Sequence, residues 1–476
     1  MTSPAPSASA PLSAPSSEEE QTAREAVVRA GVRLVETGLI ARTWGNVSAR
    51  AGDEFLITPT GRDYLTLAPE EIVPVSLADL THRGDLKPSS EKAAHQAIYR
   101  ARPDVRFVIH THQTNASAVG ACGLPGIVIT DEGGHALSAR SGPSGAAVPD
   151  GAGTAPAGLS NREAPRTTRT ALLGRRVLTA GYGLPSTKKL ADAIARALDR
   201  TPAEGHAILM AHHGAICFGR DADEALAATL QLEAASERFV RARYLAESRL
   251  PDATWDKMRQ CALSRIARPW QDTDAAFTGS DAGTDGAGAA RWASHRTGSG
   301  FAFSAVPATP PGTRAPGSDD SALPHAADPA ALPPTASAEL RLHATIYRDH
   351  PHIRAIEHTM DPDTVAVSRA NLVMRPLLDD FAQIVGTSVP TISGGPAQAS
   401  RALSHASAVL LAGAGALCCA ADAPDAEAIR MIVEKNCRTL LWSALLGRPH
   451  LIGRADAALM RAIYRAKYSR EITRNV

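Results

Sequence analysis

The feature that most constrains the fold of this chain is an internal duplication. Matching residues in segments 90–112 (SEKAAHQAIYRARPDVRFVIHTH) and 337–360 (SAELRLHATIYRDHPHIRAIEHTM) are separated by a constant offset. A second pair of segments, residues 208–219 and 409–420, aligns in the same order. Self-similarity of this kind indicates that one structural unit occurs twice. The length of 476 residues agrees with this, because it is too long for one ordinary domain.

The first unit mixes helical and strand-like patterns. QTAREAVVRAGVRLVETGL and EKAAHQAIYRAR have apolar residues at helical spacing. NVSARAG, EFLITPTG, FVIHTH and GIVIT are short strand-like runs, several of them closed by glycine. Because strands and helices are intermixed along the chain, the pattern predicts a layered α/β domain.

Composition predicts the domain boundaries. Residues 1–21, biased toward Pro, Ala and Ser, predict a disordered tail without the features of a secretory signal. The first domain is expected over residues 22–265, with a flexible Gly/Pro/Ala/Ser-rich insertion at about 138–172. Residues 266–336 predict a low-complexity linker or eroded segment. The second domain is expected over residues 337–476.

Charge and cysteine usage exclude several classes of partner. With 44% hydrophobic and 21% charged residues, the chain should fold as a water-soluble protein. Its net charge of +1 gives no basic field for nucleic acid or for an anionic membrane, and no apolar run reaches the length of a membrane span. The six cysteines show no CxxC spacing, so we expect reduced thiols in a cytoplasmic protein.

Two histidines end the strand-like run FVIHTH. Because side chains at i and i+2 of a strand point to one face, His110 and His112 should project side by side. A third histidine precedes Gly214 at a turn, although periodicity does not decide between His212 and His213. Three imidazoles are the set that holds a catalytic Zn²⁺ with one position open for substrate. The simpler alternative is a group of polar residues at a strand end and a turn.

The second unit keeps the apolar framework but lacks two of the three histidines. Met360 stands in place of His112 and Ala414 in place of His213, whereas His358 is retained. If these histidines served folding alone, the copy should need them as well. The pattern therefore predicts a metal site in the first unit, a broken site in the second, and about one Zn²⁺ per chain.

Glu91 opens the helix that follows KPSS. A carboxylate in a first turn is favoured by the helix dipole, by less than ~1 kcal/mol, and Ser89 and Ser90 are good N-cap residues. The functional alternative is that the free N–H groups and hydroxyls bind a phosphate while Glu91 faces the metal. The turns GNVSAR (45–50) and TPTG (58–61) either supply further phosphate contacts or are ordinary turns.

The ordered series TWGNVSAR, FLITPTG, PSSEKAAHQAIYRARPDVRFVIHTH and HHGAICFG resembles the class II aldolase/adducin family. The resemblance is closest to the L-fuculose-phosphate aldolase-like sugar-phosphate aldolases and runs from about residue 25 to 250. It is specific because four motifs occur in the same order at similar intervals. It implies a layered α/β/α fold, duplicated here, with a degenerate second copy.

The resemblance also implies a function and a site. It implies a zinc-dependent aldolase, a lyase that cleaves or forms a carbon–carbon bond in a sugar phosphate, such as a ketose 1-phosphate, through a metal-stabilised enediolate. Glu91 would be the general acid/base and a displaceable metal ligand beside His110, His112 and His213. The positions that match the phosphate-binding residues of the family are Thr43, Gly45, Asn46, Thr60, Gly61, Ser89 and Ser90.

Several alternatives stay open within this resemblance. The 4-epimerases of the same fold carry Asp where Glu91 stands, so glutamate favours an aldolase or a decarboxylase acting on 3-oxo acid phosphates. Adducin-like members keep the fold as a non-catalytic binding module. A hydrolase is disfavoured because no HxHxDH run occurs. Since members of the family assemble as rings with sites between subunits, we expect a homo-oligomer in which the degenerate copy supplies the neighbouring surface.

Overall fold

The computed structural model describes residues 15–40, 44–129, 135–136, 171–250, 254–266, 291–297, 300–306, 324–326 and 331–474. Most of the predicted insertion at 138–172 and most of the predicted tail at 1–21 therefore lie outside the described residues. None of the helices in the described ranges is long and apolar enough to cross a membrane.

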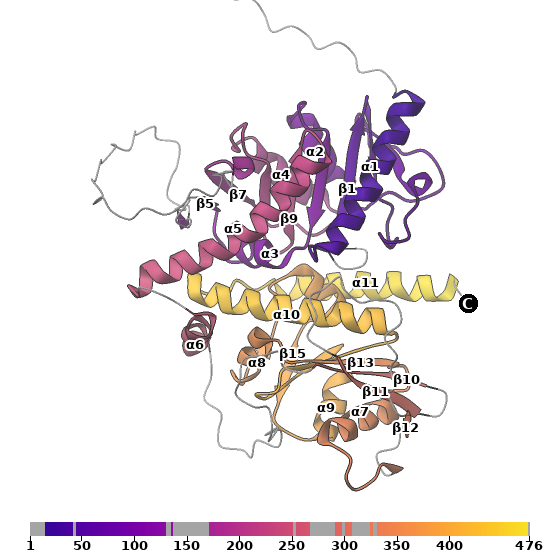
Figure 1. Cartoon of the computed structure of the whole chain (residues 1–476), viewed down its shortest axis with the longest axis vertical. Coiled ribbons are helices and arrows are strands. Elements are labelled where there is room, and N and C mark those ends of the chain that lie inside the picture. Colours follow the sequence, from indigo (N-terminus) through magenta and orange to yellow (C-terminus); the bar gives the residue numbers. More distant parts are fainter. Residues whose placement is uncertain are drawn as a thin grey trace, which may run out of the picture.

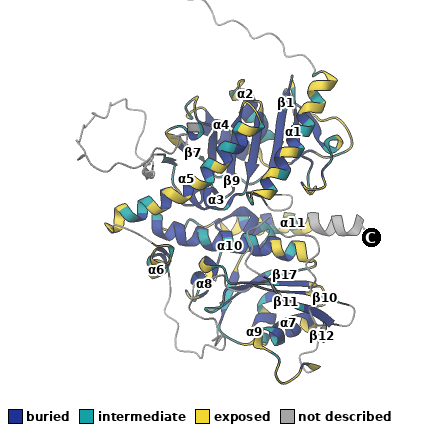
Figure 2. Ribbon diagram, viewed as in Figure 1, coloured by how far each residue is buried: buried dark blue, intermediate teal, exposed yellow. Residues whose placement is uncertain are grey.

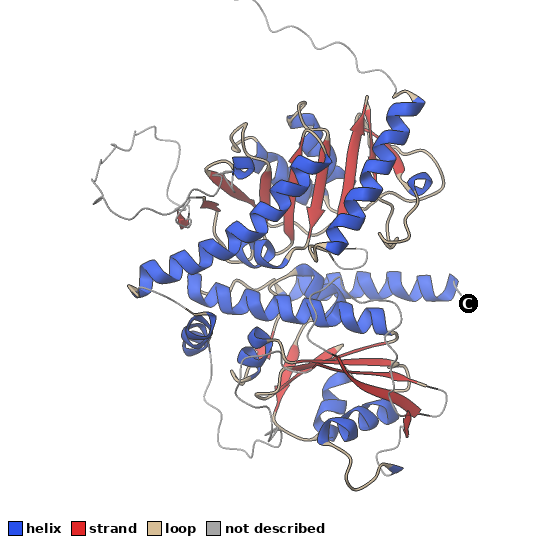
Figure 3. Cartoon of the chain, in the orientation of Figure 1, coloured by secondary structure: helices blue, strands red, loops and turns tan. Residues whose placement is uncertain are grey.

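The first half of the chain, up to residue 250, is built on one mixed sheet (Figure 3). Its nine described strands follow the order β3-β2-β1-β4-β9-β8-β7-β5-β6. The strands are β1 (Asn46–Ala51), β2 (Glu54–Ile57), β3 (Val73–Ser76), β4 (Phe107–Thr111), β5 (Gly126–Val128), β6 (His135–Ala136), β7 (Arg176–Ala180), β8 (Ala207–Met210) and β9 (Gly214–Gly219). In the described part of this sheet, β7 and β8 pair in parallel, and the other neighbouring strands pair antiparallel.

Helices cover both faces of this sheet (Figure 1). They are α1 (Ser17–Glu36), α2 (Lys92–Ala101), α3 (Thr114–Gly120), α4 (Lys188–Leu198) and α5 (Ala222–Ser248). Strand β4 shows how the layers arise, since alternate residues of a strand face opposite sides. Val108 packs in a cluster with Ile98 of α2, whereas Ile109 packs in a cluster with Val27 of α1. The predicted α/β/α layering is confirmed.

The first helix begins earlier than predicted. The tail was expected to extend to residue 21, but α1 starts at Ser17. The side chain of Ser16 accepts a hydrogen bond from the backbone N–H of Glu19 (3.2 Å), and three glutamates occupy the first turn. A serine cap and acidic residues at a helix N-terminus are both stabilising, so the run of glutamates belongs to the helix.

The second half, from residue 254, repeats the architecture. Its eight described strands follow the order β12-β11-β10-β13-β17-β16-β15-β14, which matches the first sheet from β3 to β5 and has no counterpart of β6 among the described residues. The strands are β10 (Arg291–Arg296), β11 (Gly300–Val306), β12 (Pro324–Ala326), β13 (Ala355–Thr359), β14 (Val373–Met374), β15 (Val389–Ile392), β16 (Ala408–Leu411) and β17 (Ala416–Ala420). The pair β15 and β16 is parallel, as is β7 with β8. The predicted duplication is confirmed.

The prediction of a linker or eroded segment at 266–336 is wrong in part. Strands β10, β11 and β12 lie inside it and belong to the second sheet, so the second domain begins by Arg291 instead of residue 337. The physical reason is that β10 pairs along β13. A compositional bias toward small residues does not reveal such pairing.

A buried hydrogen-bond network anchors β10 in the same way in both halves. The hydroxyl of Ser294 lies 2.7 Å from Nδ1 of His343 and 2.9 Å from the Tyr347 hydroxyl. In the first half, Ser48 makes the equivalent contacts with His95 (2.7 Å) and Tyr99 (2.8 Å). The signal for β10 was therefore present in the sequence, because ASHR before β11 repeats the VSAR of β1.

The domain boundary expected at residue 265 is also displaced. Helix α6 (Trp255–Ile266) packs on the second half, where the rings of Trp255 and Trp442 stack at 5.7 Å. Nε of Arg259 lies 2.6 Å from Oδ1 of Asp363, in the second half. Apolar stacking and an ion pair thus place α6 with the C-terminal domain.

The two halves share one hydrophobic core. The other helices of the second half are α7 (Ala338–Asp349), α8 (Pro362–Ser368), α9 (Pro396–Leu403), α10 (Ala423–Leu446) and α11 (Arg454–Arg474). Helix α10 lies between the two sheets and is buried along most of its length (Figures 1 and 2). One apolar cluster joins Phe239 of α5 and Val119 of α3 to Leu441 of α10. The second half therefore packs against the face of the first half that is formed by α3 and α5.

Candidate metal centre

Three segments of the first half bring the predicted metal ligands together. His110 and His112 come from the end of β4, His213 from the turn between β8 and β9, and Glu91 from the residue before α2. Strands β4 and β9 pair with His110 opposite Ile216, which sets the turn beside the end of β4. The structure settles the register that periodicity left open, since His213 and not His212 joins the cluster.

Two glycines allow the backbone to approach this cluster closely. At Gly214 a Cβ atom would overlap the carbonyl oxygen of Thr111, which lies between the two histidines of β4. At Gly45, where φ is +88°, a Cβ atom would overlap the carbonyl oxygen of His110. A side chain at either position would force the backbone away from the histidines.

The imidazoles face one another across a short distance. Nε2 of His112 lies 3.0 Å from Nε2 of His110, and the ligand atoms of all three histidines lie within 4.8 Å of one another. The rings of His110 and His213 are stacked, with centroids 4.8 Å apart. The Glu91 carboxylate lies among them, with Oε2 3.1 Å from Nε2 of His110 and Oε1 3.0 Å from Nε2 of His213.

The outer nitrogen of each ring has an acceptor. Nδ1 of His110 lies 2.8 Å from the carbonyl oxygen of Ala215, and Nδ1 of His112 lies 3.4 Å from Oδ2 of Asp380. Nδ1 of His213 contacts Oδ2 of Asp379. An acceptor at Nδ1 favours the tautomer with its proton there, which leaves the Nε2 lone pair directed at the centre. Nε2 of His213 is buried and makes no hydrogen bond of good geometry in the described structure, although Oε1 of Glu91 lies 3.0 Å away. This donor set fits a metal ion.

The charges in the site depend on one another. Burial opposes ionisation of Glu91, but the charges of His213 and His110 hold its pKa well below the ordinary value. Burial also opposes protonation of His213, yet Asp379 and Glu91 hold its pKa well above the ordinary value. The pKa of His112 is lowered to about 4 by burial and by the neighbouring imidazoles, against the opposing effect of the hydrogen bond that His112 donates to Asp380. The site therefore favours a Glu91 carboxylate beside positive charge.

Asn46, predicted to bind phosphate, connects Glu91 to a buried network. Its Nδ2 donates to Oε2 of Glu91 (3.0 Å), and its Oδ1 lies against Nε2 of His95. His95 is fully buried, and burial lowers its pKa to about 3, so it is a neutral ring held between Asn46 and Ser48. The contacts of Asn46 indicate that it orients the Glu91 carboxylate.

Of the other predicted phosphate-binding residues, Gly45 directly precedes β1 and Thr43 is outside the described residues, whereas the rest lie on two adjacent loops. The Thr60 hydroxyl donates to the carbonyl oxygen of Pro88 (2.9 Å), and the Ser89 N–H donates to the carbonyl oxygen of Thr58 (3.0 Å). Gly61 and Ser90 are exposed, and the Ser186 hydroxyl donates to that of Ser90 (2.8 Å). Hydroxyls and a glycine are thus gathered next to Glu91.

The corresponding place in the second half lacks this constellation. Trp292 pairs with His358 on β10 and β13, where Asn46 pairs with His110 in the first half. Nε2 of His358 is occupied by the carbonyl oxygen of Ala414 (2.6 Å). Within the described ranges, the one group of three or more possible metal ligands that converge is the set in the first half.

Sequence reasoning missed the residues that reach the site from the second half. Asp379 and Asp380 are nearly fully buried and contact His213 and His112. The available signal was a pair of adjacent aspartates in the otherwise apolar run PLLDDFAQIV. Buried carboxylates need partners, so such a pair indicates a specific contact, although not which one.

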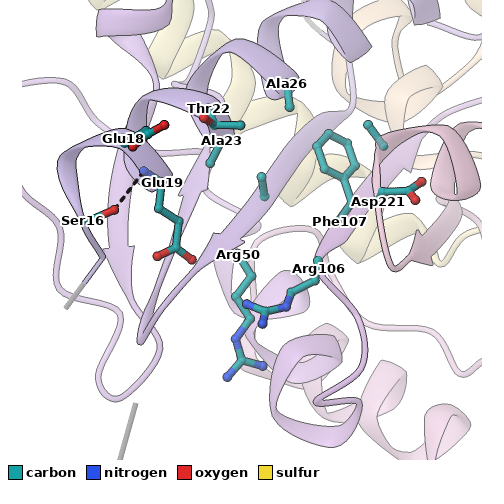
Figure 4. A pocket seen from close by; sticks show the side chains of 12 residues that line it. Ser16, Glu18, Glu19, Thr22, Ala23, Ala26, Arg50, Arg106, Phe107 and Asp221 are labelled. Carbon is teal, nitrogen blue, oxygen red and sulfur yellow. Dashed lines mark hydrogen bonds between the residues drawn. The ribbon is translucent and has the colours of Figure 1, made fainter. Parts of the chain in front are cut away.

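A separate hollow of about 440 Å³ lies at the opposite end of β4 (Figure 4). It is lined by the start of α1 and by Arg50, Arg106, Phe107 and Asp221. Phe107 begins the strand that ends at the histidines, so the hollow is roughly 10 Å from them along β4. It contains none of the predicted site residues and does not bear on the metal centre.

Known proteins with similar sequences include two sugar-phosphate aldolases. The profile of the family described as "Class II Aldolase and Adducin N-terminal domain" matches residues 25–240 and 320–441. A 5-methylthioribulose-1-phosphate/5-deoxyribulose-1-phosphate aldolase of Rhodospirillum rubrum is 30% identical over 47% of this chain and 83% of its own length. A 5-deoxy-D-ribulose 1-phosphate aldolase of Bacillus thuringiensis is 27% identical over 48% of this chain and 90% of its own.

Solved structures also match about half of the chain. An L-fuculose-1-phosphate aldolase from Thermus thermophilus is 21% identical, covering 50% of this chain and 100% of its own, with a TM-score of 0.34. A sugar-phosphate aldolase from Thermotoga maritima is 16% identical over 49% of this chain and 97% of its own, with a TM-score of 0.32. With TM-scores this low, the assignment rests on the sequence matches.

The family profile matches segments in both halves, and the two named relatives agree with the predicted enzyme class, a class II aldolase. On the strength of the two matched segments, the chain belongs to the class II aldolase and adducin family.

Proposed function

We propose that the first half is a zinc-dependent aldolase that cleaves or forms a carbon–carbon bond in a sugar phosphate. The observation that carries this proposal is the cluster of three imidazoles whose ligand atoms lie within 4.8 Å of one another, with the partly buried Glu91 carboxylate against the Nε2 atoms of His110 and His213. His110, His112 and His213 would hold the ion, and Glu91 would be a displaceable fourth ligand. The chemistry that zinc supplies when bound is Lewis-acid polarisation of the substrate carbonyl group.

Glu91 is the proposed general acid/base. In the synthetic direction its carboxylate takes a proton from the carbon beside the carbonyl group. In the cleavage direction it returns that proton to the same carbon after the carbon–carbon bond has broken. The hydrogen bond from Asn46 to Oε2 (3.0 Å) keeps the carboxylate oriented for this transfer. Proton transfer by a positioned side chain typically contributes 10²–10⁴-fold to rate.

The proposed substrate class is a ketose 1-phosphate. The two similar proteins named for 5-deoxyribulose 1-phosphate support this class. The proposed phosphate-binding residues are those predicted from the sequence, Thr43, Gly45, Asn46, Thr60, Gly61, Ser89 and Ser90. The exposed Ser90 hydroxyl, in the residue before Glu91, and the exposed Gly61 on the adjacent loop support a phosphate site there, because small polar groups and free N–H groups at a helix N-terminus bind phosphate.

The test is a turnover screen with zinc-loaded, full-length protein. Candidate substrates are 5-deoxyribulose 1-phosphate, 5-methylthioribulose 1-phosphate, fuculose 1-phosphate and a set of 3-oxo acid phosphates. We expect cleavage of at least one ketose 1-phosphate, and a loss of about 10²-fold or more in kcat for Glu91→Gln. Glu339→Gln, at the corresponding position of the second half, is the matched control and should keep full turnover.

Three outcomes would change the proposal. Full turnover by Glu91→Gln would remove its assigned role. Release of carbon dioxide from a 3-oxo acid phosphate, without cleavage of any ketose phosphate, would favour the decarboxylase alternative. A purified protein without bound metal or turnover would favour a non-catalytic, adducin-like module.

We also infer a homo-oligomer and a cytoplasmic location. Helix α10 of the second half packs on α3 and α5 of the first, and a head-to-tail contact of this kind closes a ring when the rotation between repeated units permits it. Two chains would then give a ring of four domains. Sedimentation equilibrium should show a dimer, and a stable, active monomer would contradict the ring. All six cysteines are free and five are buried, which supports a reducing compartment.

A further inference from the structure

A short segment of the second half, residues 377–379, forms two hydrogen bonds with the turn that carries His213. The carbonyl oxygen of Leu377 accepts a hydrogen bond from Nδ1 of His212 (2.8 Å), and the N–H of Asp379 donates to the carbonyl oxygen of His212 (2.9 Å). His212 has φ of 63°, a left-handed conformation that is uncommon for a residue other than glycine. The unusual turn conformation is thus held by contacts from the other half.

Asp379 is directed at the ring of His213. It is 1% exposed, and its Oδ2 contacts Nδ1 of His213. Its other oxygen, Oδ1, accepts a hydrogen bond from the N–H of Asp380 (2.7 Å). Removing a carboxylate from water is costly unless it is paired. Both of its oxygens therefore have partners, and the partner of opposite charge is an imidazole of the metal centre.

Asp380 makes a parallel contact with His112. Oδ2 of Asp380 lies 3.4 Å from Nδ1 of His112 and contacts Nζ of Lys435 on α10. Nζ of Lys435 also donates to the carbonyl oxygen of His112 (3.2 Å). Burial opposes ionisation of Asp380, yet Lys435 and His112 hold its pKa below the ordinary value. A lysine from the second half thus keeps the carboxylate charged and also holds the backbone of His112.

The hydrogen-bond acceptors of the three Nδ1 atoms come from different halves of the chain. Nδ1 of His110 is satisfied by Ala215 within the first half, whereas those of His112 and His213 meet carboxylates of the second. A carboxylate behind a metal-binding histidine fixes the tautomer and the ring orientation, and it makes the facing nitrogen a stronger ligand. The first half alone lacks this support for two of its three histidines.

We propose that Asp379 and Asp380 are positioning residues that hold His213 and His112 in the orientation a metal ion requires. The second half, whose described residues contain no such cluster of ligands, supplies them from within the same chain. This inference rests on the proposed function of the first half as a metal-dependent enzyme. It assigns the second half a role in metal affinity beyond covering the apolar surface of its partner domain.

Competition titration of full-length protein with a chromogenic chelator tests this role, using Zn²⁺ as the probe. Asp379→Asn and Asp380→Asn should each weaken zinc binding about 10–100-fold. The absorption spectrum of the Co²⁺-loaded protein should shift in both variants, because ring orientation changes at the ion. Asp363→Asn is the matched control, since Asp363 is also buried and pairs with Arg259 and Arg438 instead of a histidine. It should bind zinc as the wild type does.

The outcomes separate this inference from the proposed function. Wild-type zinc affinity and an unchanged cobalt spectrum in both histidine-facing variants would overturn the positioning role. An equal loss of affinity in Asp363→Asn would also overturn it, because general packing would then explain the effect. Should Asp379→Asn fail to fold, Asp380→Asn and Asp379→Glu carry the test, and Asp379→Glu should bind zinc more tightly than Asp380→Asn. Wild-type protein that binds no zinc would instead refute the proposed function.

Discussion

At the scale of single residues, His110 and His358 occupy the same place in the two sheets but use different ring nitrogens. Nδ1 of His110 lies against the carbonyl oxygen of Ala215, so its Nε2 faces the other histidines. Nε2 of His358 is itself taken by the carbonyl oxygen of Ala414, the residue that replaces His213. A histidine retained in a duplicated strand thus need not retain a free ligand atom.

His343 should make the protein less stable in mild acid. It is fully buried, and burial followed by the charge of His358 lowers its pKa to about 3. Between this value and the unfolded value of about 6.5, the unfolded chain binds a proton that the folded chain does not, so stability falls as the pH falls. Between pH 7 and pH 5 the loss should be about 2 kcal/mol, measured by urea unfolding.

The control for this prediction is His343→Gln, which keeps a polar group beside Ser294 without titrating. The wild type should lose about 2 kcal/mol more than this variant over the same pH interval. Parallel loss in the two proteins would show that His343 is not the group responsible.

The sequence predicted the residues whose partners are local or repeated. The spacing of His110 and His112 in a strand, and the loss of two counterparts in the copy, identified the cluster that the structure brings together. It did not identify Asp379, because its partner lies 166 residues away on the chain. Contacts between domains depend on how whole surfaces pack, which no local pattern records.

At the scale of elements, the turn between β8 and β9 depends on Gly214. A Cβ atom there would overlap the carbonyl oxygen of Thr111, a backbone atom that cannot move without displacing β4. Gly214→Ala should therefore destabilise the protein by about 2 kcal/mol and weaken zinc binding. Thermal unfolding and chelator competition measure the two effects.

Gly181→Ala provides the comparison for this substitution. A Cβ atom at Gly181 would meet nothing within 4 Å, so the change in stability should stay within about 0.5 kcal/mol. If both variants were equally stable, close approach of the two strands would not explain the glycine at 214.

Elements formed by long, periodic segments were predicted well, and short strands in biased segments were not. Helix α2 and strand β4 were recognised because apolar spacing sufficed. Strands β10, β11 and β12 were missed because they lie in a segment rich in small residues and form by pairing with β13 and with each other. Pairing across a sheet is a tertiary property, and composition alone does not contain it.

At the scale of the whole molecule, the two halves should bind one metal ion per chain. Elemental analysis of the purified full-length protein should give about one zinc per chain. The expectation follows from the three convergent histidines in the first half and from Met360 and Ala414 in the second.

Two histidine variants sharpen this measurement. His213→Ala should reduce the zinc content well below one per chain, whereas His358→Ala, in the second half, should leave it unchanged. A value of two in the wild type would mean that the second half also holds an ion, contrary to its loss of ligands.

The position of helix α10 has a consequence for how the two duplicated domains can evolve. It fills the space between two sheets, and its Lys435 touches the site on the other domain. Because α10 packs against the candidate metal centre of the first half, the second half is constrained in shape even though its own ligand positions have changed. Substitutions in the second half should accordingly impair the site of the first half.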